Sequence, residues 1–439
     1  MNPARGVPAS GWHWAAPLLI APLLLAGCSR PSTSAPSASP AGLGTSVATP
    51  ASGSASIVSP GPTSTPARQP SAALVLSDYT SSPTYTVSLV GTDGQLLAST
   101  TASSPTITAY AYPPPVSESD TRVYYLDGNT TIRYLTPEDG SGVAAQVSGP
   151  PDSVVEFAVS PDDARVAVSI EAWGEGGSGT LTETSYIEDL RTGEVLLQLP
   201  TYSCSDVNGS GGGGPSLPAC ATQVPDPVGW HGDDVVYELV YGGPGQAAPS
   251  PQFQDPWGYE LMDAATGAMG PTLCPYEPGP DPVQFPDLAE GNSALPSAAG
   301  FFCGPGASGH WTDGRLVSWS GATAVDLGSG NCWEGPAASA EGAVAFEMSK
   351  VATADECAGG LAAITIVRQG QTKQMAAVDG AALGWLDEDH LVVAEMNQGG
   401  GYDLSGPTTL QILDIGTGQL SPALPSAGIY AGAVPCLLY

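Results

Sequence analysis

The chain has 439 residues, with 43 Asp or Glu against 11 Lys or Arg, and a formal net charge of -32 at pH 7. A field of this sign repels nucleic acid, so the composition excludes nucleic acid as an expected partner. It favours cationic partners, metal ions or simple solubility. Charged residues make up only 12% of the chain, so solubility is the simplest explanation.

The first residues are typical of an exported protein. Arg5 precedes an apolar segment from Ala15 to Ala26, which suits a signal-peptide core but is short for a membrane span. The next residues complete Leu25-Ala26-Gly27-Cys28, which resembles the lipobox of bacterial lipoproteins. This resemblance implies cleavage before Cys28 and acylation of its thiol and new amino group. The alternative is an ordinary secretory signal with a chance cysteine.

Three regions follow from composition. Residues 1–27 are expected to be the lipoprotein signal peptide. Residues 28–72 are rich in Ser, Thr, Pro and Ala, with too few large apolar side chains for a core, which predicts a lipidated, disordered tether. As a flexible chain it would reach roughly 35 to 40 Å. Residues 73–439 form the folded domain, which the lipid on Cys28 would hold at the extracytoplasmic face of the cell membrane.

The stretch from Val154 to Leu199 predicts one four-stranded antiparallel unit. Its first two apolar runs alternate with polar residues on either side of Ser160-Pro161-Asp162-Asp163, as in a β-hairpin. Pro161 presets the turn, and Ser160 and Asp162 can bond the backbone around it. Two further apolar runs flank the turn from Asp189 to Gly193.

Both turns recur along the domain. Copies of the Asp-x-x-Thr/Ser-Gly turn are Asp189 to Gly193, Asp263 to Gly267, Asp326 to Gly330 and Asp414 to Gly418, with looser forms at Gly91 to Gly94, Thr136 to Gly140 and Arg368 to Gln371. Copies of the other turn are His231 to Asp234, Thr312 to Gly314, Ala340 to Gly342 and Asp387 to Asp389. Seven units of this size, with the excess length in loops, predict an all-β fold: a seven-bladed β-propeller of four-stranded antiparallel blades.

The first unit lacks an innermost strand. The apolar run from Ile429 to Leu438 follows the last hairpin without a unit of its own. We therefore expect this C-terminal strand to complete the first blade and close the ring, which removes exposed sheet edges. The later blades are expected at 106–148, 154–199, 228–274, 303–333, 338–377 and 381–425, with Pro275 to Ala299 as a long loop.

The segment from Phe157 to Ala167 resembles the strand-turn-strand motif of TolB-type propeller repeats, which are related to WD repeats. Gly384 to Leu391 and Gly229 to Val235 resemble divergent copies, whereas the Gly-His and Trp-Asp pairs of WD repeats are absent. The resemblance implies a propeller that serves as an interaction or ligand-binding scaffold. It implies no reaction.

The tight turns would all lie at one end of such a propeller and the long insertions at the other. Loops on one face of a rigid scaffold commonly carry binding. Aromatic residues in or beside them are candidates for binding a protein, a peptide or a cell-wall glycan, although each can instead pack beneath its loop. These residues are Trp173, Tyr202, Trp257, Tyr259, Tyr276, Phe301, Phe302, Trp311 and Tyr402.

Export permits disulfide bonds, and seven cysteines remain after Cys28. Pairing of nearest neighbours would join Cys204 with Cys220, Cys274 with Cys303 and Cys332 with Cys357. Cys436 would then be the unpaired cysteine. None of these spacings is typical of a zinc site.

Catalysis has little support in the sequence. The domain has only His231, His310 and His390, and no nucleophile elbow, metalloprotease helix or phosphate-binding loop. We expect no cofactor and no metal, although Asp281, Asp287 and Glu290 carry oxygens that suit Ca²⁺. The sequence thus favours a membrane-anchored binding or scaffolding lipoprotein of the cell envelope. The alternative is a propeller lyase or glycoside-active hydrolase with carboxylates near the central channel.

Truncation after Pro425 tests the closure model. Without the C-terminal strand the first blade is incomplete, so we expect the truncated chain to lose its cooperative melting transition. Circular dichroism during heating measures this, and a truncated chain that melts like the full chain would rule the model out.

Overall fold

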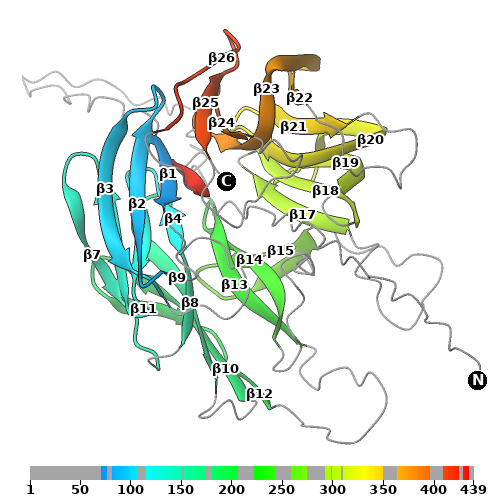
Figure 1. Ribbon diagram of the computed structural model, residues 1–439. Coiled ribbons are helices and arrows are strands. Elements are labelled where there is room, and N and C mark those ends of the chain that lie inside the picture. The colour runs from blue at the N-terminus through cyan, green and yellow to red at the C-terminus, as the bar shows by residue number, and fades with distance from the viewer. Residues whose placement is uncertain are drawn as a thin grey trace, which may run out of the picture.

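The computed structural model describes residues 71–76, 82–105, 115–150, 153–173, 180–205, 222–242, 259–273, 292–297, 299–307, 310–349, 363–395, 409–424 and 429–434. Every regular element among them is a β-strand. In these ranges no helix is long and apolar enough to cross a membrane. The strands form five antiparallel sheets that fan around a common centre (Figure 1).

The first sheet joins both ends of the described chain. Its strand order is β27-β1-β2-β3. The strands are β1 (Ser71–Leu76), β2 (Thr84–Gly91), β3 (Leu96–Ser103) and β27 (Ile429–Val434). The second sheet has the order β4-β5-β6-β7. Its strands are β4 (Val116–Glu118), β5 (Val123–Asp127), β6 (Thr131–Thr136) and β7 (Gly140–Gln146).

The third and fourth sheets follow in chain order. The third contains β8 (Val154–Val159), β9 (Arg165–Trp173), β10 (Thr180–Asp189), β11 (Glu194–Gln198) and β12 (Tyr202–Ser205). One half of β10 pairs with β11 and the other half with β12. The fourth contains β13 (Thr222–His231), β14 (Asp234–Gly242), β15 (Tyr259–Asp263) and β16 (Met269–Leu273).

The fifth sheet is continuous over ten strands. These are β17 (Asn292–Ser297), β18 (Gly300–Ala307), β19 (His310–Ser318), β20 (Thr323–Ala338), β21 (Val344–Ser349), β22 (Ala363–Arg368), β23 (Gln371–Trp385), β24 (His390–Glu395), β25 (Leu410–Asp414) and β26 (Gln419–Leu420). Its two longest strands change partners along their length. β20 pairs first with β19 and then with β21, and β23 first with β22 and then with β24.

The predicted hairpin turns are mostly confirmed. Asp189 Oδ1 accepts hydrogen bonds from the backbone N–H of Arg191 and of Thr192, both at 2.9 Å. The same pattern holds at Asp263 and Asp414. In the other turn, Ser160 Oγ accepts from the Arg165 N–H at 2.8 Å. The short polar side chains thus satisfy backbone groups that the hairpins leave unpaired.

Two predicted turns of the fifth unit are wrong, and so is the described part of the loop predicted from Pro275 to Ala299, whose residues 275–291 lie outside the described residues. β19 runs without a turn through residues 312–314, and β20 does so through 326–330. The turn between them lies at Ser318 to Ala322, where Gly321 has a φ of 85°, a left-handed value that favours glycine. The stretch predicted as a loop supplies β17, because its Leu295 pairs with Phe302. Composition hid this strand, since Pro, Ser and Asn are rare in strands.

Strand β27 pairs with β1 as its inner neighbour. Ser71 lies opposite Val434, and the Ser71 hydroxyl donates to the Val434 carbonyl at 3.3 Å. A side chain at Gly384 would meet the ring of Tyr430 at 2.4 Å, so only glycine lets this buried tyrosine of β27 lie over β23. The Tyr430 hydroxyl donates to the Trp385 carbonyl at 3.3 Å.

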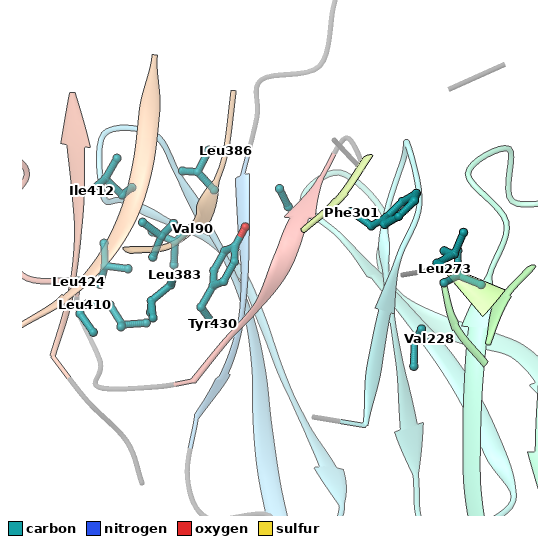
Figure 2. Packing of buried hydrophobic residues seen from close by; sticks show 14 of the residues in the cluster. Val90, Val228, Leu273, Phe301, Leu383, Leu386, Leu410, Ile412, Leu424 and Tyr430 are labelled. Atoms are coloured by element: carbon teal, nitrogen blue, oxygen red, sulfur yellow. The ribbon is translucent and has the colours of Figure 1, made fainter. Parts of the chain in front are cut away.

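Apolar clusters fill the spaces between neighbouring sheets. One joins the first sheet to the second, another the second to the third, and a third lies between the third and fourth sheets. The largest cluster includes residues of β23, β25 and β27 and also Val228, Leu273 and Phe301 from β13, β16 and β18 (Figure 2). Each sheet is therefore buried on both faces, which explains the apolar content of its strands.

Candidate functional site

Four carboxylates lie together where the third sheet meets the fourth. Glu156, Glu171 and Glu183 come from β8, β9 and β10, and Asp226 comes from β13. Glu171 lies opposite Glu183 in the register of β9 with β10. Glu171 is two residues before the end of β9, and Glu183 is three after the start of β10, so the group lies at the end away from the tight turns. We call these four residues the carboxylate cluster.

Hydrogen bonds fix two parts of the carboxylate cluster. Glu183 Oε1 accepts from the hydroxyls of Ser169 at 3.0 Å and Ser185 at 2.8 Å. Glu156 and Asp226 are hydrogen-bonded to each other through their side chains. This contact lowers the pKa of Glu156, against the larger effect of burial, and joins β8 of the third sheet to β13 of the fourth.

Burial raises the proton affinity of the carboxylate cluster. Glu171 is 6% exposed, and Glu183 and Asp226 are each 2% exposed. Burial raises the pKa of Glu156 to about 7, with the charge of Glu183 as a further cause. Burial, with the charges of Glu156 and Glu183, raises the pKa of Glu171 to about 8. Burial also raises the pKa of Glu183, although its serine bonds oppose this.

Two tyrosines border the carboxylate cluster. The ring of Tyr237 belongs to the apolar cluster between the third and fourth sheets. Burial raises the pKa of its hydroxyl, and so do the charges of Glu183 and Asp226, which places this hydroxyl beside them. Tyr202 lies opposite Glu183 in the pairing of β10 with β12. Burial and the charge of Glu183 raise the pKa of the Tyr202 hydroxyl.

The chemistry open to this arrangement is that of carboxyl groups in a poorly hydrated place. Near neutral pH such a group can hold a proton, as a general acid must, or attract a cation that neutralises it. Within the described ranges, no three or more His, Cys, Asp or Glu side chains are arranged to hold a metal ion. His231 lies at the opposite end of β13, stacked on Trp319 with ring centroids 4.5 Å apart.

Some predicted binding residues fall where no side chain is described. Trp257, Tyr276 and Tyr402 lie outside the described residues, as do the acidic residues Asp281, Asp287 and Glu290. The backbones of Trp173, Tyr259 and Trp311 lie at the end of β9, at the start of β15 and within β19.

The other three predicted aromatic residues have described side chains. Tyr202 is partly buried and borders the carboxylate cluster. Phe301 and Phe302 are 6% and 0% exposed, respectively. Phe301 packs on Trp319 with ring centroids 5.6 Å apart, and Phe302 packs with residues of β19 to β21. These two rings pack inside the fold and present no face at the surface.

The predicted disulfide pairs involve undescribed positions. Cys204, Cys303 and Cys332 lie in β12, β18 and β20 by their backbones. Cys28, Cys220, Cys274, Cys357 and Cys436 lie outside the described residues. Lipidation and disulfide pairing therefore stay predictions.

Sequence reasoning missed the carboxylate cluster, although a signal was present. Glu156 alternates with apolar residues in a strand whose other positions are buried, and Glu171 ends a similar run. A charged residue inside such a run is unusual, because an ionised side chain is rarely buried without a partner. The sequence could not show that residues from β8, β9, β10 and β13 meet.

Comparisons with known proteins find similarity of fold only. The sequence matches no known protein-family profile, and no curated protein matches it significantly. A structure of dihydro-heme d1 dehydrogenase NirN in complex with DHE aligns over 84% of this chain and 75% of its own, with 10% identity and a TM-score of 0.41. A Mycobacterium tuberculosis puromycin-hydrolyzing peptidase aligns over 83% of this chain and 54% of its own, with 12% identity and a TM-score of 0.43.

A third similar structure is the WD40 domain of SCAP from fission yeast. It aligns over 79% of this chain and 86% of its own, with 8% identity and a TM-score of 0.31. Similarity at these levels indicates neither ligand nor reaction. The class of the chain follows from its own strands, which form four-stranded antiparallel sheets packed face to face around a centre. It is an all-β protein of the β-propeller type.

Glu171→Gln tests the electrostatics of the carboxylate cluster. A carboxyl group whose pKa is higher in the folded chain than in the unfolded chain lowers the stability of the protein as the pH rises. The loss begins near the pKa in the unfolded chain, about 4.3, and is complete above the pKa in the folded chain. We therefore expect the wild-type stability to fall between about pH 5 and 8. The neutral amide removes one charge and can donate to the neighbouring carboxylates, so the variant should be more stable at pH 8 by about 2 kcal/mol.

Urea unfolding at a series of pH values measures this difference. Glu194→Gln is the matched control, since Glu194 is exposed on β11 and its variant should follow the wild-type pH profile. If Glu171→Gln and the wild type had the same dependence of stability on pH, the raised pKa of Glu171 would be contradicted.

Proposed function

We propose that the chain is a lipid-anchored, extracytoplasmic binding protein built as a closed seven-bladed propeller of the TolB type. Its ligand, a protein, peptide or cell-wall glycan, binds at the end away from the tight turns. The observation that carries the proposal is the difference between the two ends. At one end of the fold, short turns and ion pairs connect neighbouring strands and units. At the other end lies the buried carboxylate cluster.

The seven-blade count is supported by the long strands. β20 and β23 change partners midway, so each can act as the outer strand of one blade and the inner strand of the next. This divides the ten-stranded sheet into three blades, which join the four shorter sheets. Closure is supported by the contacts of β27, which lies against β4 and β23 as well as β1.

Aromatic side chains also link neighbouring units at three places, which supports a ring of packed blades. Trp230 Nε1 donates to the Ala158 carbonyl at 3.0 Å, from the fourth sheet to the third. Trp385 Nε1 makes the same 3.0 Å bond to the carbonyl of Ala337. Trp319 connects the fourth sheet to the fifth, because its ring stacks on His231 and contacts Phe301 of β18 at a tilt.

Polar contacts link neighbouring units at the turn end. Arg165 pairs with Asp233 at 2.9 Å between the third and fourth sheets, and Arg368 pairs with Asp389 at 3.0 Å. Between the second and third sheets, Asp163 accepts hydrogen bonds from Tyr124 and Thr121. A scaffold cross-linked at one end leaves the other end for ligand-binding loops.

A second candidate function is an enzyme that uses carboxyl chemistry. The observation that favours it is the raised pKa of Glu156 and Glu171, about 7 and 8, because a general acid must keep its proton near neutral pH. Turnover of a glycan that is lost in Glu171→Gln would favour the enzyme over the binding protein.

Binding is tested by a thermal-shift screen of the full chain against soluble peptidoglycan fragments and peptides. A ligand that binds only the folded state raises the melting temperature by mass action. We expect a saturable shift with at least one of these probes, weakened by Tyr202→Ala. The control is Leu196→Ala, a change at an exposed residue of β11. A chain that no probe stabilises would contradict ligand binding.

Anchoring is tested by Cys28→Ser in a bacterial host. The wild-type chain should incorporate labelled palmitate and sediment with membranes, and the variant should do neither, because the serine hydroxyl is not acylated in a lipobox. Cys436→Ser is the matched control and should behave as the wild type. A Cys28→Ser chain that still carries the label would refute the anchor.

A further inference from the structure

A groove separates the outer parts of the second and third sheets. Its volume is about 820 Å³, which lies in the range of natural ligand sites, and residues of β7, β9, β10 and β11 line it. The inner strands of the same two sheets meet in a shared apolar cluster, so the groove opens where the sheets diverge. The outermost strands of the two sheets, β7 and β11, border it (Figure 1).

Strand register defines the wall that the third sheet contributes. Alternate residues of β10 line the groove: Thr182, Thr184, Tyr186 and Glu188. A further lining residue lies opposite each of them on β9 or β11: Ala172, Ile170, Gln198 and Val195. The wall therefore runs along six residue steps of β10, about 20 Å. Glu183 points to the opposite face of β10, so the groove is separate from the carboxylate cluster.

The second sheet borders the groove with the edge of β7. Four consecutive residues of this strand, from Val143 to Gln146, line the groove. Side chains of consecutive strand residues point to opposite faces, so such a run means that the edge of the strand faces the groove. β7 is the last strand of its sheet, and no strand of the described chain pairs with this edge. The strand has no charged residue and no proline, which commonly protect an edge strand.

Polar groups in the groove lack partners. Within the described ranges, the hydroxyls of Thr182 and Thr184 and the carboxylate of Glu188 form no hydrogen bond or ion pair. Burial raises the pKa of Glu188, so a positive charge beside it would stabilise the ionised form. Arg191 also borders the groove, but it is exposed and pairs with Asp189 Oδ2 at 3.6 Å. A basic group on a ligand would therefore complement Glu188.

These features fit an extended peptide better than a sugar. Among the described residues that line the groove, Tyr186 is the one aromatic residue, and its ring is 9% exposed and packs in the apolar cluster. It offers no flat face on which a sugar could stack. An extended peptide can pair its backbone with a free strand edge and place alternate side chains in the groove. Ile170 and Val195 suit apolar side chains there, and Glu188 suits a basic one.

We propose that an extended peptide segment of a partner protein adds to the edge of β7 as a further strand of the second sheet. The side chains on one face of this segment lie against β9, β10 and β11, with apolar side chains toward Ile170 and Val195 and a basic side chain at Glu188. The site goes beyond the binding function proposed above, because it lies between two outer strands and shares no residue with the carboxylate cluster.

The experiment uses matched peptides and the full chain. The probe is acetyl-Ser-Val-Ser-Lys-Ser-Val-Ser-amide, which matches the length of the groove and, when extended, presents valine, lysine and valine on one face. One control peptide has norleucine in place of lysine. Another carries N-methyl groups on all its backbone amides and cannot donate hydrogen bonds to β7.

Isothermal titration measures the affinity of the three peptides. We expect saturable binding of the probe, about fivefold weaker binding of the norleucine peptide, which lacks the charge, and no binding of the methylated peptide. Equal affinity for all three would overturn the proposal. Absence of probe binding at millimolar concentration would overturn it as well.

Two pairs of variants locate the site. Val143 is 55% exposed, so the fold should tolerate Val143→Lys, which gives β7 the charge that protects natural edge strands. This variant should bind the probe at least about tenfold more weakly, whereas Leu96→Lys, the same kind of change on an exposed residue of β3, should bind it normally. Glu188→Gln should lose the preference for lysine over norleucine, and Glu194→Gln, a change at an exposed residue of β11, should keep it. Normal binding by Val143→Lys, or an unchanged preference in Glu188→Gln, would contradict the assignment.

Hydrogen exchange gives an independent readout. Backbone N–H groups on the free edge of β7 become hydrogen-bonded when a strand is added, so exchange in a fragment that covers residues 140–146 should slow when the probe binds. Unchanged exchange in this fragment, with the probe bound, would rule out strand addition.

A further variant separates this site from the binding end proposed above. Tyr202 lies opposite Glu183, on the other face of β10, so Tyr202→Ala should bind the probe normally. If Tyr202→Ala lost probe binding, the peptide would bind at the other end and this inference would fail. If a soluble glycan bound in the groove, as shown by its loss in Val143→Lys, and the peptides did not, this inference would fail and the proposed function would stand.

Discussion

The pairing of β27 with β1 is the constraint on which the rest of the structure depends. It joins Ser71 to Val434, residues 363 positions apart. Every sheet is buried on two faces, so no sheet is complete in isolation, and the first lacks its inner strand until the last strand arrives. Contacts of such sequence separation form late and make folding slow. The N-terminal strand therefore presents an unpaired edge until the chain is finished.

A repeated device aligns the sheets once they have formed. In the third and fourth sheets, Arg165 lies over the ring of Trp230, 4.7 Å from its centroid, and pairs with Asp233, while the indole donates to the carbonyl of Ala158. Arg368, Asp389, Trp385 and Ala337 repeat the ion pair and the indole bond further along the fifth sheet. The buried indole rings supply apolar surface for packing. The N–H group of each indole donates one hydrogen bond, which fixes the position of one sheet relative to its neighbour. Two units of different sequence therefore make the same kinds of contact.

The two ends of the fold use charge in opposite ways. At the turn end, arginines meet carboxylates near solvent, where each pair adds little energy but several together hold the turns in register. At the other end, carboxylates are buried beside one another, and their desolvation works against folding. A cluster of like charges that lowers stability is typical of a site that serves a ligand. Glu118 is an exception to this contrast, because it is buried beside Gly432 of β27 directly before the tight turn from Ser119 to Arg122, and burial raises its pKa well above the usual value.

The sequence by itself determined most of the strands, most of the turns and the pairing of the last strand with the first. Those features depend on local patterns: alternation in residues such as Val155 to Val159, turn chemistry at Asp189 to Gly193, and an apolar run left over at Ile429. Prediction from local pattern failed between residues 292 and 330. The Pro, Gly and Ser residues of this stretch are compatible with a strand or a turn, and only the pairing with β18 and β19 determines which of the two forms. The same local reasoning placed Phe301 and Phe302 near loops and did not show that they are buried.

Only the tertiary structure decided the candidate site. Glu156, Glu171, Glu183 and Asp226 are scattered over 70 positions on four strands, and no single strand shows that the four side chains meet. Their approach depends on the register of three strands and on the packing of one sheet against the next. The interaction between like charges in a buried place arises from that packing, because burial and short distance exist only in the folded chain.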